Sequence, residues 1–254
     1  MKITIDTERR ELVEQEDGRE RVLPLYSREA FEAITHCWIV VGWDQKHPYT
    51  FSWMGRPIIQ LPHDLIRIQE VIHRVRPDVL IETGVAHGGS LVFYASLFRA
   101  MAKGRAIGVD VEIRPHNRRA IEAHELFSWI RLFEGDSADP AVVRRVAAEI
   151  GAGESVMVVL DSKHSRDHVL AELEAYHGLV TPGSYIVATD GVMRWVAGTP
   201  RGKPEWSWDN PVTAVEEFAG RHAEFVIERP AWPFNESGLS ADVTHWPSAW
   251  LRRR

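Results

Sequence analysis

The feature that most constrains the fold is a regular alternation of short apolar runs with amphipathic segments of helical length. Five apolar runs have the length of buried strands and end at turn residues: 78–83, 105–110, 130–134, 155–161 and 184–190. Helical spacing marks the segments around them: 63–75, 90–103, 115–126, 140–150, 165–178 and 211–220. Such alternation is typical of a parallel sheet with helices on both faces. We predict a doubly wound, mostly parallel α/β fold with late strands at 225–228 and 243–246.

The two ends of the chain differ from this central pattern. Ten of the fourteen residues in 8–21 are charged, which favours a solvated helix or a mobile arm. From Ser27 the sequence becomes apolar, periodic and rich in aromatic residues. We therefore predict an N-terminal arm and cap segment over 1–62, partly helical, and a single domain over 63–254. The arginines at 252–254 are expected to form a solvated terminus.

Composition excludes several classes of protein. The 254 residues carry a net charge of −6, so no overall positive field attracts nucleic acid. Cys37 is the single cysteine, which excludes an intrachain disulfide and favours a reducing compartment. No apolar run approaches the roughly 18 residues of a membrane span. The start of the chain lacks the apolar core of a secretory leader, and we expect a cytoplasmic protein.

Acidic residues fall at the carboxyl ends of the expected strands: Glu82, Asp110, Asp161 and Asp190, with Asp136 just beyond another strand. In an open parallel sheet, ligands bind outside these ends. Carboxylates that gather on one edge repel one another unless a cationic group binds among them. We therefore predict that this edge of the sheet is the functional site and that its ligand is at least partly cationic.

The first of these strands runs into a glycine loop that ends at Ser90. Glu82, just before the loop, would repel a pyrophosphate but would hold an α-amino group. Asp110, at the end of the next strand, is placed to bind the two hydroxyls of a ribose. Together with the Gly135-Asp136-Ser137 turn, these features favour S-adenosylmethionine as the cofactor. An NAD(P)-dependent oxidoreductase is the alternative, and Glu82 argues against it.

Two further acids and a histidine suggest the chemistry. Asp161 and Asp190 end strands that should be neighbours, which favours a hard cation such as Mg²⁺; the alternative is a helix cap and a turn. His164 follows three residues after Asp161 and is the predicted catalytic base. His87, inside the glycine loop, is its rival.

Nine of the ten tryptophans lie in the segments that flank the central alternation. Their flat apolar rings suit the walls of an acceptor pocket for a sugar or an aromatic ring. Burial against the sheet, or at a subunit interface where aromatic residues are enriched, is an equally good explanation.

Several motifs occur in a specific order: ETGVAHGGS, GVD, GDS, LDSKHSRDHVLAELEAY, PGSYIVATD and NPVTAVEEFA. In this order the chain resembles the cephalosporin hydroxylase and rhamnosyl O-methyltransferase family, over roughly residues 50–254, and the DS-x-HS-x-x-HVLAELE stretch is the most specific element. The resemblance implies a Rossmann-like class I S-adenosylmethionine-dependent methyltransferase of antibiotic or surface-glycan pathways. It also implies a homo-oligomer.

The resemblance assigns roles to single residues. It places the cofactor loop at Glu82, Gly84, Gly88 and Ser90, the ribose acid at Asp110, the adenine side at Asp136 and Ser137, and the Mg²⁺ ligands at Asp161 and Asp190. His87, inside the loop, is also a predicted cofactor-binding residue. Relatives with a metal site tend to carry two adjacent acids where this chain has Thr189-Asp190, and threonine supplies at most a neutral oxygen.

The implied reaction is O-methylation of a small-molecule acceptor, a 6-deoxysugar such as a rhamnosyl unit, with Asp161 and His164 in catalytic roles. An aromatic diol would satisfy the same chemistry. A non-catalytic sugar- or partner-binding protein that retains the fold is the alternative of another class. Hydroxylation is not supported, because no two-histidine, one-carboxylate set for iron has an evident spacing.

Overall fold

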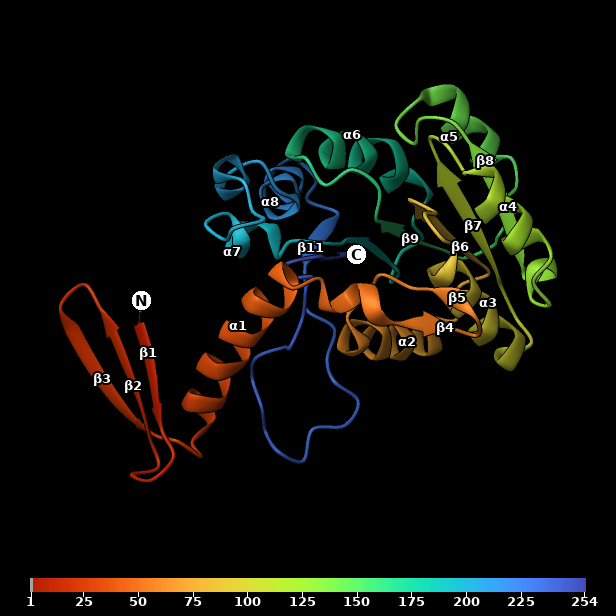
Figure 1. Cartoon of the computed structure of the whole chain (residues 1–254). Coiled ribbons are helices and arrows are strands. Elements are labelled where there is room, and N and C mark those ends of the chain that lie inside the picture. The colour runs from red at the N-terminus through yellow and green to blue at the C-terminus, as the bar shows by residue number, and fades with distance from the viewer. Residues whose placement is uncertain (1) are drawn as a thin grey trace.

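The computed structural model describes residues 2–254, and its centre is a seven-stranded sheet (Figure 1). The strand order is β11(Phe225–Ile227), β12(Trp250–Arg253), β10(Tyr185–Ala188), β9(Val156–Leu160), β6(Val79–Thr83), β7(Arg105–Asp110) and β8(Ile130–Glu134). β12 is antiparallel to both neighbours, whereas β10, β9, β6, β7 and β8 are parallel to one another. The predicted doubly wound, mostly parallel sheet is confirmed.

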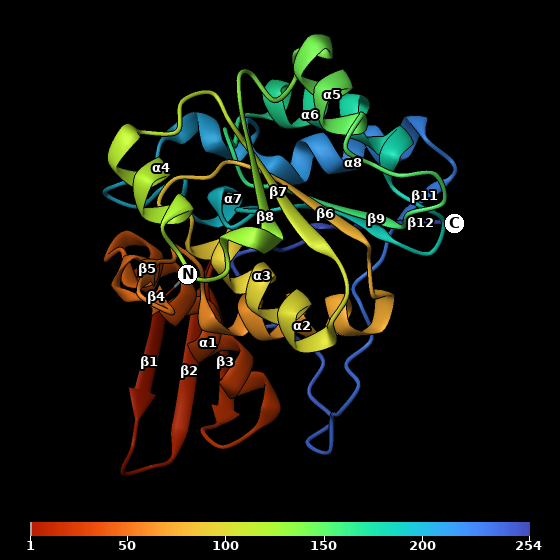
Figure 2. The same ribbon diagram turned by 90° about the vertical axis from the view of Figure 1, so that its right-hand side faces the viewer.

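Helices cover both faces of this sheet (Figure 2). One face packs against α2(Pro62–Val75), α3(Gly89–Met101) and α4(Pro115–Glu122), and the other against α5(Pro140–Ala147), α6(Arg166–Tyr176) and α8(Pro211–Arg221). Successive residues of β6 alternate between the faces: Leu80 belongs to the first core, and Val79 and Ile81 to the second. None of the described helices is both long enough and apolar enough to cross a membrane.

The order of the strands reverses between β6 and β9. From β6 the chain continues outward through β7 to β8, and then returns to β9 on the other side. Thr83 and Leu160 are paired at the carboxyl ends of these two strands. Such a switch point leaves a crevice in which open α/β sheets bind their ligands.

The prediction of a helix or mobile arm over 8–21 is wrong. Residues 2–24 form an antiparallel meander, β1(Lys2–Asp6), β2(Glu11–Glu16) and β3(Arg19–Pro24), followed by α1(Arg28–Asp44), and the meander projects away from the central sheet (Figure 1). Leu12 and Leu23 are buried against Ala30 of α1. Leu12 and Leu23 are cross-strand partners in β2 and β3, and this pairing outweighed the high local charge on which the prediction was based.

The C-terminal predictions also need correction. Residues 243–246 form no strand, because the backbone there binds a side chain of α2 instead of a sheet neighbour. The expected solvated terminus is an inner strand: β12 includes Arg252 and Arg253 and lies between β10 and β11. Leu251 in this strand is fully buried. Two predicted helices end early, α4 at Glu122 and α5 at Ala147.

Candidate active site

The glycine loop connects β6 to α3 and passes directly over the end of β9. Gly84 has φ +89°, and a Cβ atom there would lie 2.0 Å from the backbone oxygen of Asp161. Only glycine tolerates both the conformation and this approach. The loop therefore lies close to the carboxyl ends of both central strands, and Ser90 lies in the first turn of α3.

Glu82 is fully buried at the end of β6. Its Oε2 accepts a hydrogen bond of 2.6 Å from the Ser90 hydroxyl, while Oε1 has no partner among the described residues. Burial raises the pKa of Glu82 to about 8, and the Ser90 and Tyr94 hydroxyls oppose this rise. A buried carboxyl oxygen without a donor fits a ligand that brings an ammonium group to this point.

Asp110 holds the glycine loop in place. Its Oδ2 accepts hydrogen bonds from the backbone N–H groups of Val85 (2.8 Å) and Ala86 (3.2 Å). Asp110 also borders a cavity of about 410 Å³, here called the inner cavity, which Gly84, Asp136, Ser137 and Asp161 line as well. The structure thus brings the predicted ribose acid and the predicted adenine-side residues to one cavity, between the loops that follow β6, β7, β8 and β9.

A buried glutamate organises the far side of the inner cavity. Glu172 of α6 is fully buried and accepts hydrogen bonds from the hydroxyls of Ser137 and Ser162 (2.7 Å for Ser162). His168 lies 3.4 Å from the same carboxylate, and this hydrogen bond raises the pKa of His168. Sequence reasoning missed Glu172, because a glutamate within a charged helix resembles part of a solvated face.

Asp161, His164 and Asp190 meet between the ends of β9 and β10. One ligand atom from each lies within 4.8 Å of the others, and His164 Nε2 is 3.3 Å from Asp190 Oδ2. Burial, followed by repulsion from Asp190, raises the pKa of Asp161 well above its usual range. Two carboxylates held together in this way fit a divalent cation, which prefers oxygen ligands and would relieve the repulsion.

Two neutral residues contact Asp161. Gln60, just before α2, donates a hydrogen bond of 2.9 Å from Nε2 to Asp161 Oδ2. The Thr189 hydroxyl contacts Asp161 Oδ1 and lies 2.9 Å from the Leu160 carbonyl oxygen. Thr189 therefore contributes a donor to Asp161. No local pattern marked Gln60, because it lies 101 residues before its partner.

A second cavity, of about 710 Å³ and here called the outer cavity, opens on the other side of the cluster. His164 and Asp190 border it, and Ser162 and Lys163 border both cavities. Trp43 of α1 and Trp206 of η4(Pro204–Ser207) line its wall in an edge-to-face pair with ring centres 5.5 Å apart. Trp246 and Trp250, in contrast, are buried in the core of the domain.

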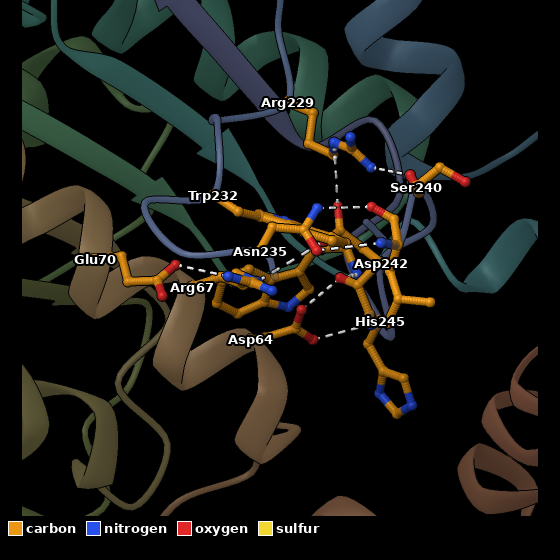
Figure 3. A network of polar contacts seen from close by, with 12 residues as sticks. Asp64, Arg67, Glu70, Arg229, Trp232, Asn235, Ser240, Asp242 and His245 are labelled. Atoms are coloured by element: carbon orange, nitrogen blue, oxygen red, sulfur yellow. Dashed lines mark hydrogen bonds and ion pairs between the residues drawn. The ribbon is translucent and has the colours of Figure 1, made fainter. Parts of the chain in front are cut away.

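His245 is a further residue of the outer cavity, and sequence reasoning missed it. Asp64 of α2 accepts hydrogen bonds from the Thr244 hydroxyl and from the His245 N–H (2.9 Å), while the His245 carbonyl accepts one from Val192 (3.0 Å). The imidazole points away from this network (Figure 3) and borders the outer cavity. Burial lowers the pKa of His245.

Residues 228–249, the segment that contains His245, contact α2 at a second position, Arg67. The guanidinium groups of Arg67 and Arg229 lie 4.3 Å and 5.0 Å from the centre of the Trp232 ring. Trp232 Nε1 donates to Asp242 (2.9 Å; Figure 3). The two attachments hold His245 in position.

His87 is placed differently from His164. Its backbone carbonyl accepts hydrogen bonds from the guanidinium group of Arg56, at 2.9 Å from Nε. It is not among the residues that line the inner or the outer cavity. Of the two predicted candidates for the base, only His164 lies beside the acidic pair.

Comparisons with known proteins agree with this geometry. The profile of the family described as Rhamnosyl O-methyltransferase/CmcI matches residues 45–254. The rhamnosyl O-methyltransferase of Mycobacterium leprae (strain TN) is 29% identical over 193 residues, which is 73% of this chain and 79% of that protein.

Two solved structures share the fold. A structure of CmcI with Mg and SAM has a TM-score of 0.52 at 18% identity and covers 81% of this chain and 77% of that chain. The MycE methyltransferase from the mycinamycin biosynthetic pathway, with Mg and SAH, has a TM-score of 0.50 at 20% identity and covers 94% of this chain and 66% of that chain.

The strand order, the antiparallel β12 and the glycine loop are those of the class I methyltransferase fold. The chain belongs to the rhamnosyl O-methyltransferase/CmcI family, and it is an S-adenosylmethionine-dependent O-methyltransferase.

Proposed function

We propose that the protein methylates a hydroxyl of a rhamnosyl-type deoxysugar, with the assistance of Mg²⁺, in natural-product or glycan biosynthesis. The observation that carries this proposal is the position of Asp161, His164 and Asp190 between two cavities. A donor in the inner cavity and an acceptor in the outer cavity would meet at this cluster. S-adenosylmethionine, when bound, supplies the methyl group on a positively charged sulfur.

The inner cavity is proposed to bind this cofactor through the predicted residues. Glu82 Oε1, buried and without a partner among residues 2–254, accepts from the amino group. Asp110 contacts the ribose, and Asp136 and Ser137 lie on the adenine side. The buried Glu172 orients Ser137 through its hydroxyl and acts as a positioning residue.

Asp161 and Asp190 are the proposed metal ligands. Mg²⁺ bound there supplies positive charge that lowers the pKa of an acceptor hydroxyl. Gln60 orients Asp161 through its hydrogen bond to Oδ2. Because Thr189 donates to Asp161, acceptor hydroxyls and water would complete the coordination.

His164 is the proposed base. If its Nε2 carries the proton and donates to Asp190 Oδ2, Nδ1 is left as the acceptor. His164 Nδ1 would then take the proton of the acceptor hydroxyl, which would leave the oxygen free to accept the methyl group that bound S-adenosylmethionine would supply from its sulfur. Alignment of oxygen, carbon and sulfur is worth about 7–11 kcal/mol in well-oriented systems.

The segment 1–62 is proposed to act as an arm and a cap over the domain 63–254. Trp43, Pro48 and Ile59 from this segment line the outer cavity. Trp43 and Trp206 would pack against the face of a sugar ring, and the imidazole of His245 would contact one of its hydroxyls. This arrangement also accommodates an aromatic diol, which is the alternative acceptor.

The test uses labelled S-adenosylmethionine with a panel of rhamnosides and catechols, with and without EDTA. We expect transfer to a rhamnoside, its loss in EDTA, and recovery with excess Mg²⁺. Asp190→Asn should abolish the response to Mg²⁺ but retain cofactor binding. Transfer only to catechols would overturn the sugar acceptor, and full activity in EDTA would overturn the metal. Cofactor binding without transfer to any acceptor would favour a non-catalytic binding protein.

A further inference from the structure

Cationic side chains without ion-pair partners gather at the outer cavity. Lys46, Lys163, Arg201 and Lys203 border it, and none of them forms an ion pair among residues 2–254. Some cations elsewhere on the surface are paired, as Arg166 is with Glu217. A chain with a net charge of −6 has no general excess of positive charge to account for this gathering.

Three of these cations come from two segments that meet at the end of α1 and are here called the cationic rim: Lys46, Arg201 and Lys203. The Arg201 N–H donates to Asp44 Oδ1 (3.0 Å), which ties residue 201 to the end of α1, two residues before Lys46. Lys203 Nζ lies 6.0 Å from the centre of the Trp206 ring. The rim therefore adjoins the tryptophan pair that is proposed to hold the sugar.

Four acidic residues lie near these cations. Asp190, Glu205 and Asp209 border the outer cavity, and Asp44 accepts the Arg201 N–H described above. Asp190 lies beside His164 and Asp161, where a divalent cation is proposed to balance the acidic pair. Asp44, Glu205 and Asp209 then face Lys46, Lys163, Arg201 and Lys203, which leaves one positive charge in excess at the outer cavity.

We propose that the acceptor is a phosphorylated sugar, with its phosphate bound at the cationic rim. This inference rests on the proposed function, because it places the sugar against Trp43 and Trp206 and its reactive hydroxyl at Asp161 and Asp190. Three side chains from two segments suit a phosphate, which carries up to two negative charges and several acceptor oxygens. A volume of about 710 Å³ accommodates a sugar with its phosphate. A nucleoside diphosphate sugar and a simple sugar phosphate share this chemistry.

Binding of inorganic pyrophosphate tests the rim without any methyl transfer. The triple variant Lys46→Gln, Arg201→Gln, Lys203→Gln is compared with the wild type by calorimetry at low salt. Arg144→Gln, an exposed arginine of α5 outside both cavities, is the matched control. We expect pyrophosphate to bind about tenfold more weakly to the triple variant, unchanged to the control, and more weakly to the wild type as salt rises. Equal binding by the triple variant and the wild type would overturn the proposal.

Kinetics with three acceptors identify the source of the phosphate. They are dTDP-rhamnose, rhamnose 1-phosphate and methyl α-rhamnoside. We expect kcat/KM to be higher for the two phosphorylated acceptors than for methyl α-rhamnoside. The ratio of these kcat/KM values should fall in the triple variant and in Arg201→Gln alone. A preference for dTDP-rhamnose over the 1-phosphate would assign the nucleotide source, and equal use would assign the phosphate alone.

A wild type that uses methyl rhamnoside as well as the other two acceptors would refute the inference. If no acceptor is methylated while the triple variant still loses pyrophosphate, the proposed function fails and the phosphate subsite stands.

Discussion

The buried carboxyl of Glu82 lowers the stability of the fold, whereas the same group is proposed to strengthen cofactor binding. Burial raises its pKa from 4.5 to about 8. Between these two values the folded chain holds a proton that the unfolded chain has lost, so stability falls as pH rises through this window. Replacement by glutamine keeps the shape of the side chain and removes this loss. We therefore expect Glu82→Gln to stabilise the fold and to weaken cofactor binding.

The magnitudes follow from the pKa. A rise from 4.5 to about 8 corresponds to roughly 4 kcal/mol of lost stability at pH 7.5. The glutamine amide must replace the hydrogen bond with Ser90, and an imperfect replacement costs about 1–3 kcal/mol. The net gain is about 2 kcal/mol, which corresponds to a rise in Tm of roughly 4–8 °C. Loss of a charge-assisted hydrogen bond to the cofactor costs about 1.5–3 kcal/mol, or roughly 10–150-fold in Kd.

The assay measures Tm without ligand near pH 5, 6.5 and 8, together with titration of S-adenosylmethionine by calorimetry. The difference in Tm between variant and wild type should be small near pH 5 and should grow toward pH 8. Glu236→Gln, which alters an exposed glutamate, should show no pH-dependent difference. A difference in Tm that is constant with pH, or an unchanged Kd for S-adenosylmethionine, would refute the reasoning and leave Glu82 a purely structural residue.

Three further predictions concern other parts of the chain. Leu251→Ala, at a fully buried position of β12, should lower the free energy of unfolding by about 2–5 kcal/mol in urea, whereas Arg254→Ala should change it little; equal effects would contradict the inner position of β12. Asp64→Ala should remove the hydrogen bonds that hold residues 244 and 245, and should raise KM for the acceptor about tenfold without altering the Kd for S-adenosylmethionine. His245→Ala should also raise this KM. If KM is unchanged in both variants, His245 does not belong to the acceptor site. Light scattering should report a homo-oligomer, because α1 exposes apolar side chains that include Trp38, and Trp38→Ser should shift the assembly toward the monomer; a monomeric wild type would contradict this expectation.

The core of the fold could be predicted because its signals are local. Strands β7 and β8 begin and end at the predicted residues, since a short apolar run bounded by turn residues has few alternative structures when helices flank it. The family resemblance, confirmed by the match over 45–254, rests on the same contiguous motifs. The roles of single site residues stay predictions, although the structure brings Asp161, His164 and Asp190 together.

The ends of the chain were mispredicted because their partners are distant in sequence. The meander of β1–β3 is stabilised by Leu12 and Leu23 against α1, which outweighs the high local charge. At the other end, Asp64 binds the backbone of residue 245 across 181 positions, so residues 243–246 form no strand and β12 begins later.

The amino-acid sequence by itself determined the class of fold, the glycine loop and the row of acids at the strand ends, because each depends on neighbours within a few residues. Only the tertiary structure decided that Gln60 contacts Asp161, that Glu172 binds the Ser137 hydroxyl at the inner cavity, and that His245 borders the outer cavity. The physical reason is that the role of a buried polar side chain depends on the groups that pack around it and form hydrogen bonds with it. For these three residues, packing supplies those groups from far along the chain.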